Sequence, residues 1–369
     1  KGSLSSLEAG MAIKEGILKA RPEAKITVKP LADGGEGTTD ALLFGMGGSE
    51  RSIEVTGPLG DKITSSYGIL EDGKTAVLEI AGAAGIKLIP SNKLNPLYTT
   101  TYGVGEMIKD AIFQGCRNFI IGIGGSSTND GGIGMLTALG YEFYNDGEKI
   151  SLPKGEDLSG IDSLTTNNAL KELSQCNFRI ACDVNNPLYG PNGAAHIFGP
   201  QKGATPEIIE ILDGGLRNYS ELVKKTIGKD TSSVPGTGAA GGLGYAFLTF
   251  LNGKLESGID IILDQIRLEE DIKDCDLVIT GEGKLDFQTT MGKAPIGVAK
   301  LAKKYKKKVI AFAGGVTEDA GKCNEEGIDA FFSILRLPMT VDKAMEYHVS
   351  RDNMIATAEQ VFRLINIYN

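Results

Sequence analysis

The sequence predicts an α/β protein in which a doubly wound parallel-sheet domain is interrupted by a second, mixed α/β domain. Both ends of the chain alternate helix-like and strand-like segments, which is the pattern of α/β units. The middle of the chain opens instead with β-rich segments separated by turn residues. Glycine accounts for 50 of 369 residues, twice its usual share of roughly 7%. Because these glycines gather in a few clusters, we expect ligand-facing loops.

Residues 1–50 and 266–369 together form the predicted parallel-sheet domain. Apolar residues at helical spacing predict a helix over 4–20, and a β-rich run predicts a strand over 24–29. The later elements alternate, with strands at 276–280, 308–313 and 330–334, and helices near 293–305, 317–327 and 351–367. Four strands are few for a doubly wound sheet, so we expect a further strand before Lys1.

Residues 51–265 form the predicted inserted domain. Its expected elements are, in order, an antiparallel meander over 51–82, a helix at about 100–115, a strand at 118–121 and a helix over 205–225. The last helix has clear start signals, since Thr205 is a good N-cap and Pro206 suits the first helical position.

Composition excludes several classes of function. The formal net charge is −9, which argues against a nucleic-acid or membrane-surface partner. Only two histidines occur, His196 and His348, so a histidine-rich metal cluster is excluded and a Ser–His–Asp triad is disfavoured. The five cysteines are scattered without CxxC spacing, and no apolar run approaches the roughly eighteen residues of a membrane span. We therefore expect a cytoplasmic protein.

The segment GIGGSSTNDGGIGMLTALG, residues 122–140, directly follows the apolar run at 118–121. It contains seven glycines in nineteen residues, whereas a loop that only turns needs one or two. Glycine lets backbone N–H groups approach an anion because no Cβ intervenes. The segment therefore predicts a loop that binds a phosphate or a carboxylate.

Three further loops carry acidic or amide side chains near predicted strand ends, where ligands of open α/β sheets bind. They are ADGGEGT (32–38), ACDVNNPLYG (181–190) and TGEGKLDFQ (280–288). Such oxygen ligands beside anion-binding loops suit Mg²⁺ together with a phosphorylated substrate. Phosphoryl transfer needs positioning, charge neutralisation and a carboxylate base, which a protein with few histidines can supply. We therefore favour phosphoryl transfer as the reaction class.

Two familiar nucleotide motifs are absent or weak. No GxxxxGK[ST] segment occurs. The segment GTGAAGG (236–242) fits GxGxxG, but no predicted strand precedes it, which disfavours a dinucleotide fingerprint.

Several long motifs occur in the order found in the bacterial type I glycerate kinases, which the chain resembles over essentially its whole length. They are KGSLSS, PLADGGEGT, GIGGSSTNDGG, ACDVNNPLYG, FGPQKGA, GTGAAGGLG and ITGEGKLDFQT followed by GKAP. The resemblance implies a flavodoxin-like domain built from both chain ends, an inserted α/β domain and an active site in the interdomain cleft, which closes on substrate. It also implies transfer of the γ-phosphoryl group of ATP to D-glycerate with Mg²⁺, usually yielding 2-phosphoglycerate, with 3-phosphoglycerate left open. Family members carry an APDSF-like segment before KGSLS that this sequence lacks.

Residue types and the resemblance together give a set of candidate site residues. Asp183 and Asp286 are candidates for the base that accepts the glycerate hydroxyl proton, and Asp130 and Glu282 are candidates for Mg²⁺ binding. The candidate substrate- and phosphate-binding residues are Lys1, Ser3, Asp33, Glu36, Gly124, Gly125, Ser126, Ser127, Asn129, Asn185, Lys202, Gly281, Gly283 and Lys293. The structural alternatives are helix capping by Asp33 or Asp130, an Asx turn at Asp183 and an acidic first helical turn at 282–286.

Two other functions remain open at this point. One is an ATP-dependent kinase for another small hydroxy acid, such as hydroxypyruvate or tartronate, since every such acceptor offers a carboxylate. The other is a nucleotide- or sugar-acid-binding sensor without turnover, which the intact acidic and glycine-rich loops disfavour. A homodimer is compatible with the sequence.

Overall fold

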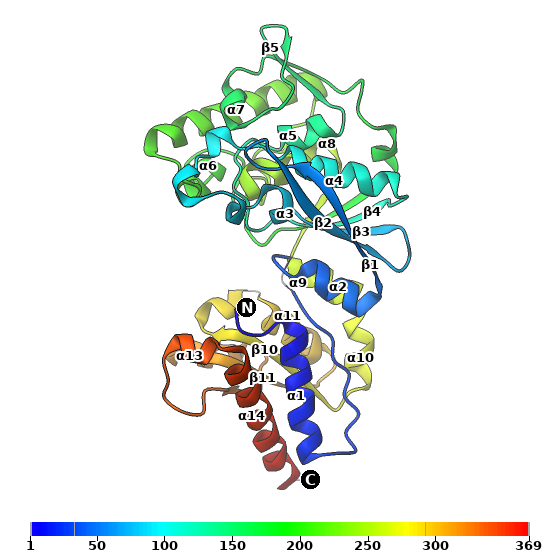
Figure 1. The fold of residues 1–369 in the computed structure, drawn as a ribbon, viewed down its shortest axis with the longest axis vertical. Helices are drawn as coiled ribbons and strands as arrows, with labels where there is room; N and C mark the ends of the chain where they lie inside the picture. Colours follow the sequence, from blue (N-terminus) through cyan, green and yellow to red (C-terminus); the bar gives the residue numbers. More distant parts are fainter. Residues whose placement is uncertain (1, 33, 292, 368–369) are drawn as a thin grey trace. The chain divides into compact units, whose positions relative to one another are not determined.

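The computed structural model describes residues 2–32, 34–291 and 293–367 (Figure 1). Two sequence-predicted site residues, Lys1 and Asp33, lie outside the described residues. The chain forms two compact units: unit 1 comprises Lys1–Asp33 and Ile262–Asn369, and unit 2 comprises Gly34–Ile261. Each unit combines helices with sheet, so the protein is of the predicted mixed α/β class. None of the described helices is both long and apolar enough to cross a lipid bilayer.

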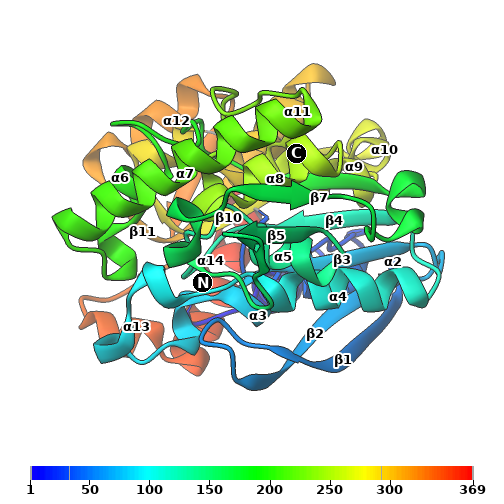
Figure 2. The same ribbon diagram turned by 90° about the horizontal axis from the view of Figure 1, so that it is seen from above.

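Unit 2 is built on a six-stranded sheet in the order β1-β2-β3-β4-β8-β9, of which Figure 2 labels β1 to β4. Its strands are β1 (Gly48–Thr56), β2 (Lys62–Leu70), β3 (Thr75–Glu79), β4 (Asn118–Gly122), β8 (Asn177–Ala181) and β9 (Lys254–Glu256). The first three strands form the predicted antiparallel meander, and β3, β4, β8 and β9 run parallel. The sheet is anchored at its centre by Phe119 of β4 and Phe178 of β8, whose rings stack 4.8 Å apart.

A second, smaller sheet of unit 2 has the order β6-β5-β7. Its strands are β5 (Glu142–Asn145), β6 (Glu148–Lys149) and β7 (Ser163–Thr165). The helices of this unit are α2 (Thr38–Met46), α3 (Ala81–Ala84), α4 (Tyr102–Phe113), α5 (Ile133–Ala138), α6 (Ala194–Phe198), α7 (Pro206–Ile227) and α8 (Leu243–Phe250), and α9 (Gly258–Gln265) crosses the unit boundary. Helix α7 begins as predicted, with the Thr205 side chain accepting a hydrogen bond from the N–H of Ile208 at 3.4 Å.

Unit 1 contains a parallel three-stranded sheet in the order β10-β11-β12. Its strands are β10 (Leu277–Leu285), β11 (Lys308–Val316) and β12 (Ala330–Ser333). Its helices are α1 (Ser6–Ala20), α10 (Leu268–Asp274), α11 (Ala294–Lys304), α12 (Lys322–Glu325), α13 (Val341–Met345) and α14 (Tyr347–Ile367).

Helices cover both faces of the central strand β11. Its residues 309–313 are all buried, and successive side chains of a strand point to opposite faces. Ile310 and Phe312 share a core with α1 and α14, while α11 also lies against β10 and β11. Helices α1 and α14 approach closely at Gly16, where a Cβ would overlap the carbonyl oxygen of Ile355.

The structure places the unit boundaries at 33/34 and 261/262 rather than at 50/51 and 265/266. Helix α2 belongs to unit 2 because it packs on β2, where the side chains of Thr39 and Leu43 lie against Gly68. The predicted strand at 24–29 is wrong. These residues are alternately more and less exposed, as in a strand, but they form no ladder with any described strand.

Two predictions in unit 1 need correction. The helix predicted near 317–327 is a 3-10 turn at Glu318–Gly321 followed by the short α12. Strand β10 was expected to end at 280 but continues to Leu285, because its ladder with β11 extends to the pair Leu285–Val316.

Candidate active site

The carboxyl ends of four parallel strands meet at one edge of the unit 2 sheet. The register pairs Glu79 of β3 with Gly122 of β4, Gly122 with Ala181 of β8, and Ala181 with Glu256 of β9. The segments that leave these strands therefore lie next to one another at this edge. Ligands of α/β proteins bind at such edges.

The loop that precedes α2 lies against the same edge. A Cβ on Gly122 would overlap the carbonyl oxygen of Gly34, and a Cβ on Gly34 would overlap the side-chain Cβ of Ala181. A Cβ on Gly34 would also lie 3.1 Å from Cα of Gly258. Residues 34–38, 122–132 and 181–190 are thus brought together within unit 2 by glycines that permit close backbone approach.

Gly124 and Gly125 are the exposed part of the 122–132 loop. Gly125 has φ +72, a conformation that favours glycine. No described residue accepts a hydrogen bond from the N–H of Gly124 or Gly125. Their neighbours are firmly held, since the N–H of Ile86 donates to the carbonyl of Gly125 at 2.9 Å and the N–H of Ser127 donates to that of Ala84 at 2.9 Å. Two open amide donors therefore sit on a fixed backbone.

The polar side chains that follow point into the protein rather than outward. Ser126, Ser127, Asn129 and Thr128 are all buried. The Ser127 hydroxyl donates to the carbonyl of Ala84 at 2.9 Å, whereas neither polar atom of the Asn129 side chain has a partner among the described residues. Contact with a ligand through these side chains would require the loop to rearrange.

Asp130 is fully buried and caps helix α5. Its carboxylate accepts hydrogen bonds from the N–H and the hydroxyl of Thr101, at 2.8 and 2.7 Å. It also accepts the N–H groups of Gly132 at 3.1 Å and Gly134 at 3.3 Å. Burial raises the pKa of Asp130, and these four donors oppose that rise. The geometry supports the capping alternative, because ligand contact would break these bonds.

Lys202 ends the 3-10 turn η6 (Pro200–Lys202) and is only 2% exposed. Its Nζ donates to Oγ of Ser126 at 2.9 Å and to the carbonyl of Thr128 at 2.6 Å. Desolvation lowers the pKa of Lys202 to about 7, against the attraction of Asp130. The expectation that Lys202 binds phosphate directly does not fit this position, since its ammonium group lies beneath the loop.

Asp183 lies at the carboxyl end of β8 and is exposed. Its Oδ1 accepts the N–H of Gly258 at 3.0 Å, at the start of α9. The nearby Asn185 is also exposed. An exposed carboxylate is compatible with a role in proton transfer as well as with capping.

Two charged groups at this edge were missed by the sequence analysis. Glu79, at the end of β3, accepts the N–H of Thr39 at 2.8 Å and that of Gly37 at 3.3 Å, so its carboxylate occupies the start of α2. Lys87 pairs with Glu36 at 2.6 Å. The signal for Glu79 was present, as a lone acidic residue that ends an apolar strand.

The glycines of GTGAAGG serve backbone packing. A Cβ on Gly241 would overlap the carbonyl oxygen of Thr128, and one on Gly242 would lie 2.7 Å from Cα of Gly131. No strand leads directly into this segment in the described structure, so the GxGxxG pattern is not a dinucleotide fingerprint here.

In unit 1, the predicted loop TGEGKL is part of strand β10. A Cβ on Gly281 would lie 2.5 Å from the carbonyl oxygen of Phe312, and one on Gly314 would lie 2.6 Å from that of Gly283. Gly281 and Gly314 therefore allow the two strands to pair closely, and Gly283 lies within the same strand as Gly281. The prediction that Gly281 and Gly283 form an anion-binding loop does not fit this geometry.

The charged side chains at the end of β10 form a small network. Glu282 pairs with Lys293 at 3.0 Å and accepts the hydroxyl of Thr289 at 3.0 Å. Asp286 pairs with Lys284 at 3.3 Å, and its Oδ1 is buried without a partner among the described residues. Desolvation acts to raise the pKa of Asp286, but the nearby lysines and the N–H of Thr289 lower it below its usual value.

The remaining predicted residue, Ser3, precedes α1. A capping box forms the start of this helix. The N–H of Ser5 donates to the Glu8 carboxylate at 2.8 Å, and the N–H of Glu8 donates to the Ser5 hydroxyl at 3.2 Å. No three His, Cys, Asp or Glu side chains of the described part of the chain are grouped as metal ligands.

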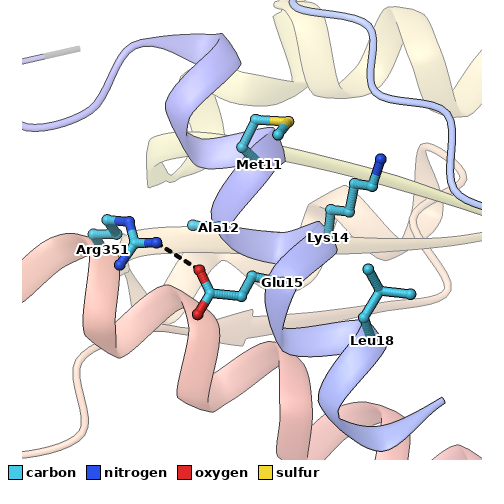
Figure 3. Close-up of a pocket in the computed structure, with 6 residues that line it drawn as sticks. All are labelled: Met11, Ala12, Lys14, Glu15, Leu18 and Arg351. Atoms are coloured by element: carbon cyan, nitrogen blue, oxygen red, sulfur yellow. Dashed lines mark hydrogen bonds and ion pairs between the residues drawn. The ribbon is translucent and has the colours of Figure 1, made fainter. Parts of the chain in front are cut away.

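A separate surface groove lies on α1 and α14 of unit 1 (Figure 3). Arg351 points toward Glu15, and the two are paired at 2.5 Å beside Met11 and Leu18. None of the sequence-predicted site residues lines this groove.

The fold belongs to the class of α/β proteins that carry ligand-binding loops at the carboxyl ends of parallel strands. The sequence matches the glycerate kinase family over residues 1–366. It is 47% identical to the glycerate 2-kinase of Escherichia coli (strain K12), covering 98% of this chain and 94% of that protein. It is 44% identical to the glycerate kinase of Bacillus subtilis (strain 168), covering 100% and 96%. The chain therefore belongs to the glycerate kinase family.

A solved structure agrees with this assignment. A crystal structure from Salmonella typhimurium LT2, assigned as glycerate kinase 2, superposes with a TM-score of 0.91 at 43% identity. The match covers 100% of this chain and 96% of the other. The family resemblance stated from sequence motifs is confirmed.

Proposed function

We propose that this chain transfers the γ-phosphoryl group of ATP to D-glycerate, with the amides of Gly124 and Gly125 binding phosphoryl oxygens. Family membership and full-length relatives named glycerate kinase support the reaction. The observation that carries the site is that the N–H groups of the exposed residues Gly124 and Gly125 have no described acceptor, at the carboxyl edge of the unit 2 sheet. Amides fixed before the ligand arrives stabilise developing charge without reorganisation.

Asp183 is the candidate for the base in this unit. It is the exposed carboxylate that follows β8, the strand that pairs directly with β4. Its bond to Gly258 fixes the carboxylate without burying it. A carboxylate so placed accepts the proton of the glycerate hydroxyl as the oxygen attacks phosphorus.

Unit 1 supplies the candidates for Mg²⁺. No cluster of three acidic ligands exists among the described residues, but Mg²⁺ in kinases is held by one or two carboxylates together with substrate phosphates. The buried, unpartnered Oδ1 of Asp286 fits such a ligand, and Glu282 lies on the same strand end. When bound, the ion would neutralise phosphate charge. Lys293, which pairs with Glu282, would add a positive charge beside the phosphate.

Unit 1 supports the finer assignment of a flavodoxin-like domain. Parallel strands β10, β11 and β12 with helices over both faces of β11 are the features that support it. A crystal structure of this chain tests whether further parallel strands pair with β10 or β12.

The phosphate-binding role is tested by Gly124→Ala. Among the described residues, a Cβ at this position meets only Cα of Gly35, at 3.6 Å, so the fold tolerates the methyl group while the methyl group crowds the amides. We expect KM for ATP to rise about tenfold with the melting temperature unchanged. Gly214→Ala is the matched control, since that glycine lies on the exposed face of α7 with open space around it. Equal kinetics for the two variants would reject the proposed site.

We propose 2-phosphoglycerate as the product, in line with the relative named glycerate 2-kinase. The product is tested with enolase, which uses 2-phosphoglycerate directly. Signal with enolase alone supports this regiochemistry, whereas signal that requires added phosphoglycerate mutase identifies the 3-phosphate. ADP release with hydroxypyruvate and tartronate, compared with D-glycerate, tests the acceptor.

A further inference from the structure

We propose that Lys202 is a positioning residue of the phosphoryl-transfer site, fixing Ser126 and Thr128 so that the amides of Gly124 and Gly125 stay open to phosphate. The inference rests on the proposed function of this loop. It departs from direct binding by Lys202, because the side chain is 2% exposed and its two described acceptors belong to the loop itself.

Lys202 holds the loop through two hydrogen bonds. Its Nζ reaches a side-chain oxygen on Ser126 and a backbone oxygen on Thr128, so it spans Ser127. The residue between these two attachment points is held by Ala84, whose carbonyl accepts both the N–H and the hydroxyl of Ser127. The backbone immediately after the exposed glycines is therefore held by both Lys202 and Ala84.

Lys202 is itself held by its backbone. The following Gly203 has φ +91, and a Cβ there would overlap the carbonyl oxygen of Leu94. The turn η6 also closes through hydrogen bonds, with the N–H of Lys202 donating to the carbonyl of Gly199 at 2.9 Å. The ammonium group consequently has little freedom to follow a loop that moves.

The charge on Lys202 depends on few neighbours. Asp130, on the same loop, is the charged group that acts on it. Helix α6 contributes His196, which faces Glu210 and Asp213 of α7 at 3.9 and 4.0 Å, and the contact at Leu94 brings no charge. Burial lowers the pKa of Lys202 to about 7, so the ammonium loses its proton as pH rises through the neutral range.

The first test compares Lys202→Met with Lys229→Met in the full chain. Lys229 is the matched control: it is half-buried in unit 2, and its Nζ donates to the carbonyls of Leu248 and Thr249 at 2.6 and 3.1 Å, away from the loop. We expect Lys202→Met to lower kcat/KM for ATP about 30-fold and Lys229→Met to change it less than twofold. Equal kinetics for wild type and Lys202→Met would overturn the inference.

The pH profile supplies a readout that a purely structural role would not move. We expect kcat/KM for ATP to fall above about pH 7 in the wild type and in Lys229→Met, because the charge-assisted hydrogen bonds weaken as Lys202 loses its proton. This limb should be absent in Lys202→Met, whereas the titration of ATP itself is common to all three proteins. A limb that persists unchanged in Lys202→Met contradicts the inference.

Hydrogen exchange separates this inference from the proposed function. If residues 122–134 exchange faster in Lys202→Met while kinetics stay normal, Lys202 holds the loop but the loop does not bind phosphate. If exchange and kinetics are both unchanged, Lys202 does not position the loop.

Should Lys202→Met fail to fold, Ser126→Ala removes one of the two acceptors and leaves the lysine in place. We then expect a smaller loss of kcat/KM, about threefold, with the pH limb retained but displaced. An unchanged kcat/KM and pH limb in Ser126→Ala would overturn the inference.

Discussion

The loop at 122–132 in unit 2 and strand β10 in unit 1 have similar amino-acid compositions but different structures. Both join an apolar run to glycines mixed with acidic and hydroxyl residues. In the first, exposed glycines leave amide donors open at a sheet edge, while Asp130 turns inward. In the second, Gly281 of β10 and Gly314 of β11 let the two strands pair closely, and Glu282 and Asp286 remain near the strand end. Glycine enrichment alone therefore does not distinguish a ligand loop from tight strand pairing.

The largest expected difference between the two segments comes from replacing their aspartates, Asp130 and Asp286, with alanine. Asp130→Ala leaves four buried donors without an acceptor, and we expect it to lower the free energy of unfolding by about 3–5 kcal/mol in urea denaturation. Asp286→Ala should cost less than about 1 kcal/mol and lower kcat instead. Similar unfolding free energies for the two variants would mean that Asp130 is not a structural cap.

The pH dependence of the free energy of unfolding tests the protonation state of Lys202, which lies beneath the loop. The pKa of Lys202 is lowered to about 7 in the folded chain, below its unfolded value, so the folded state binds fewer protons between pH 7 and 10. Its contribution to stability therefore rises with pH in this window, by about 2 kcal/mol from pH 7 to 9. The difference between wild type and Lys202→Met, followed by urea denaturation at several pH values, measures this contribution. A difference that does not vary with pH would mean that Lys202 keeps its charge throughout.

Alanine at one glycine of each region sharpens the comparison further. Gly281→Ala should cost about 1–2 kcal/mol, because its Cβ would lie 2.5 Å from a backbone carbonyl that cannot move freely. Gly124→Ala should cost less than about 0.5 kcal/mol and act on KM for ATP. Thermal denaturation of both variants checks the stabilities, and a larger cost at Gly124 would reverse the roles assigned to the two segments.

The smallest effect concerns the exposed ion pair beside the loop. The side chains of Glu36 and Lys87 are 75% and 79% exposed, so Glu36→Gln should change the free energy of unfolding by less than about 0.5 kcal/mol. Chemical denaturation at low and high salt measures this contribution. A cost above about 1 kcal/mol would show that the pair fixes loop 34–37 in addition to any role in binding.

Local patterns were sufficient for much of the secondary structure. The helices α1, α4 and α7 and the meander β1–β3 were predicted because apolar spacing, capping residues and turn residues act within a few positions. The strand predicted at 24–29 was wrong because a strand depends on a partner that local sequence patterns do not show. A strand needs a hydrogen-bonded neighbour, and the alternation of its own side chains does not supply one.

The sequence by itself determined the family, through long motifs in a fixed order, and it located the glycine-rich and acidic segments. Only the tertiary structure decided which of these residues face solvent. It turned Asp130 and Lys202 inward, exposed Asp183, and added Glu79 to the edge of the unit 2 sheet. The physical reason is that burial and hydrogen-bond partners are set by segments far apart in the chain, such as Thr101 with Asp130 and Lys202 with Ser126. A residue's own neighbours in sequence carry no information about those contacts.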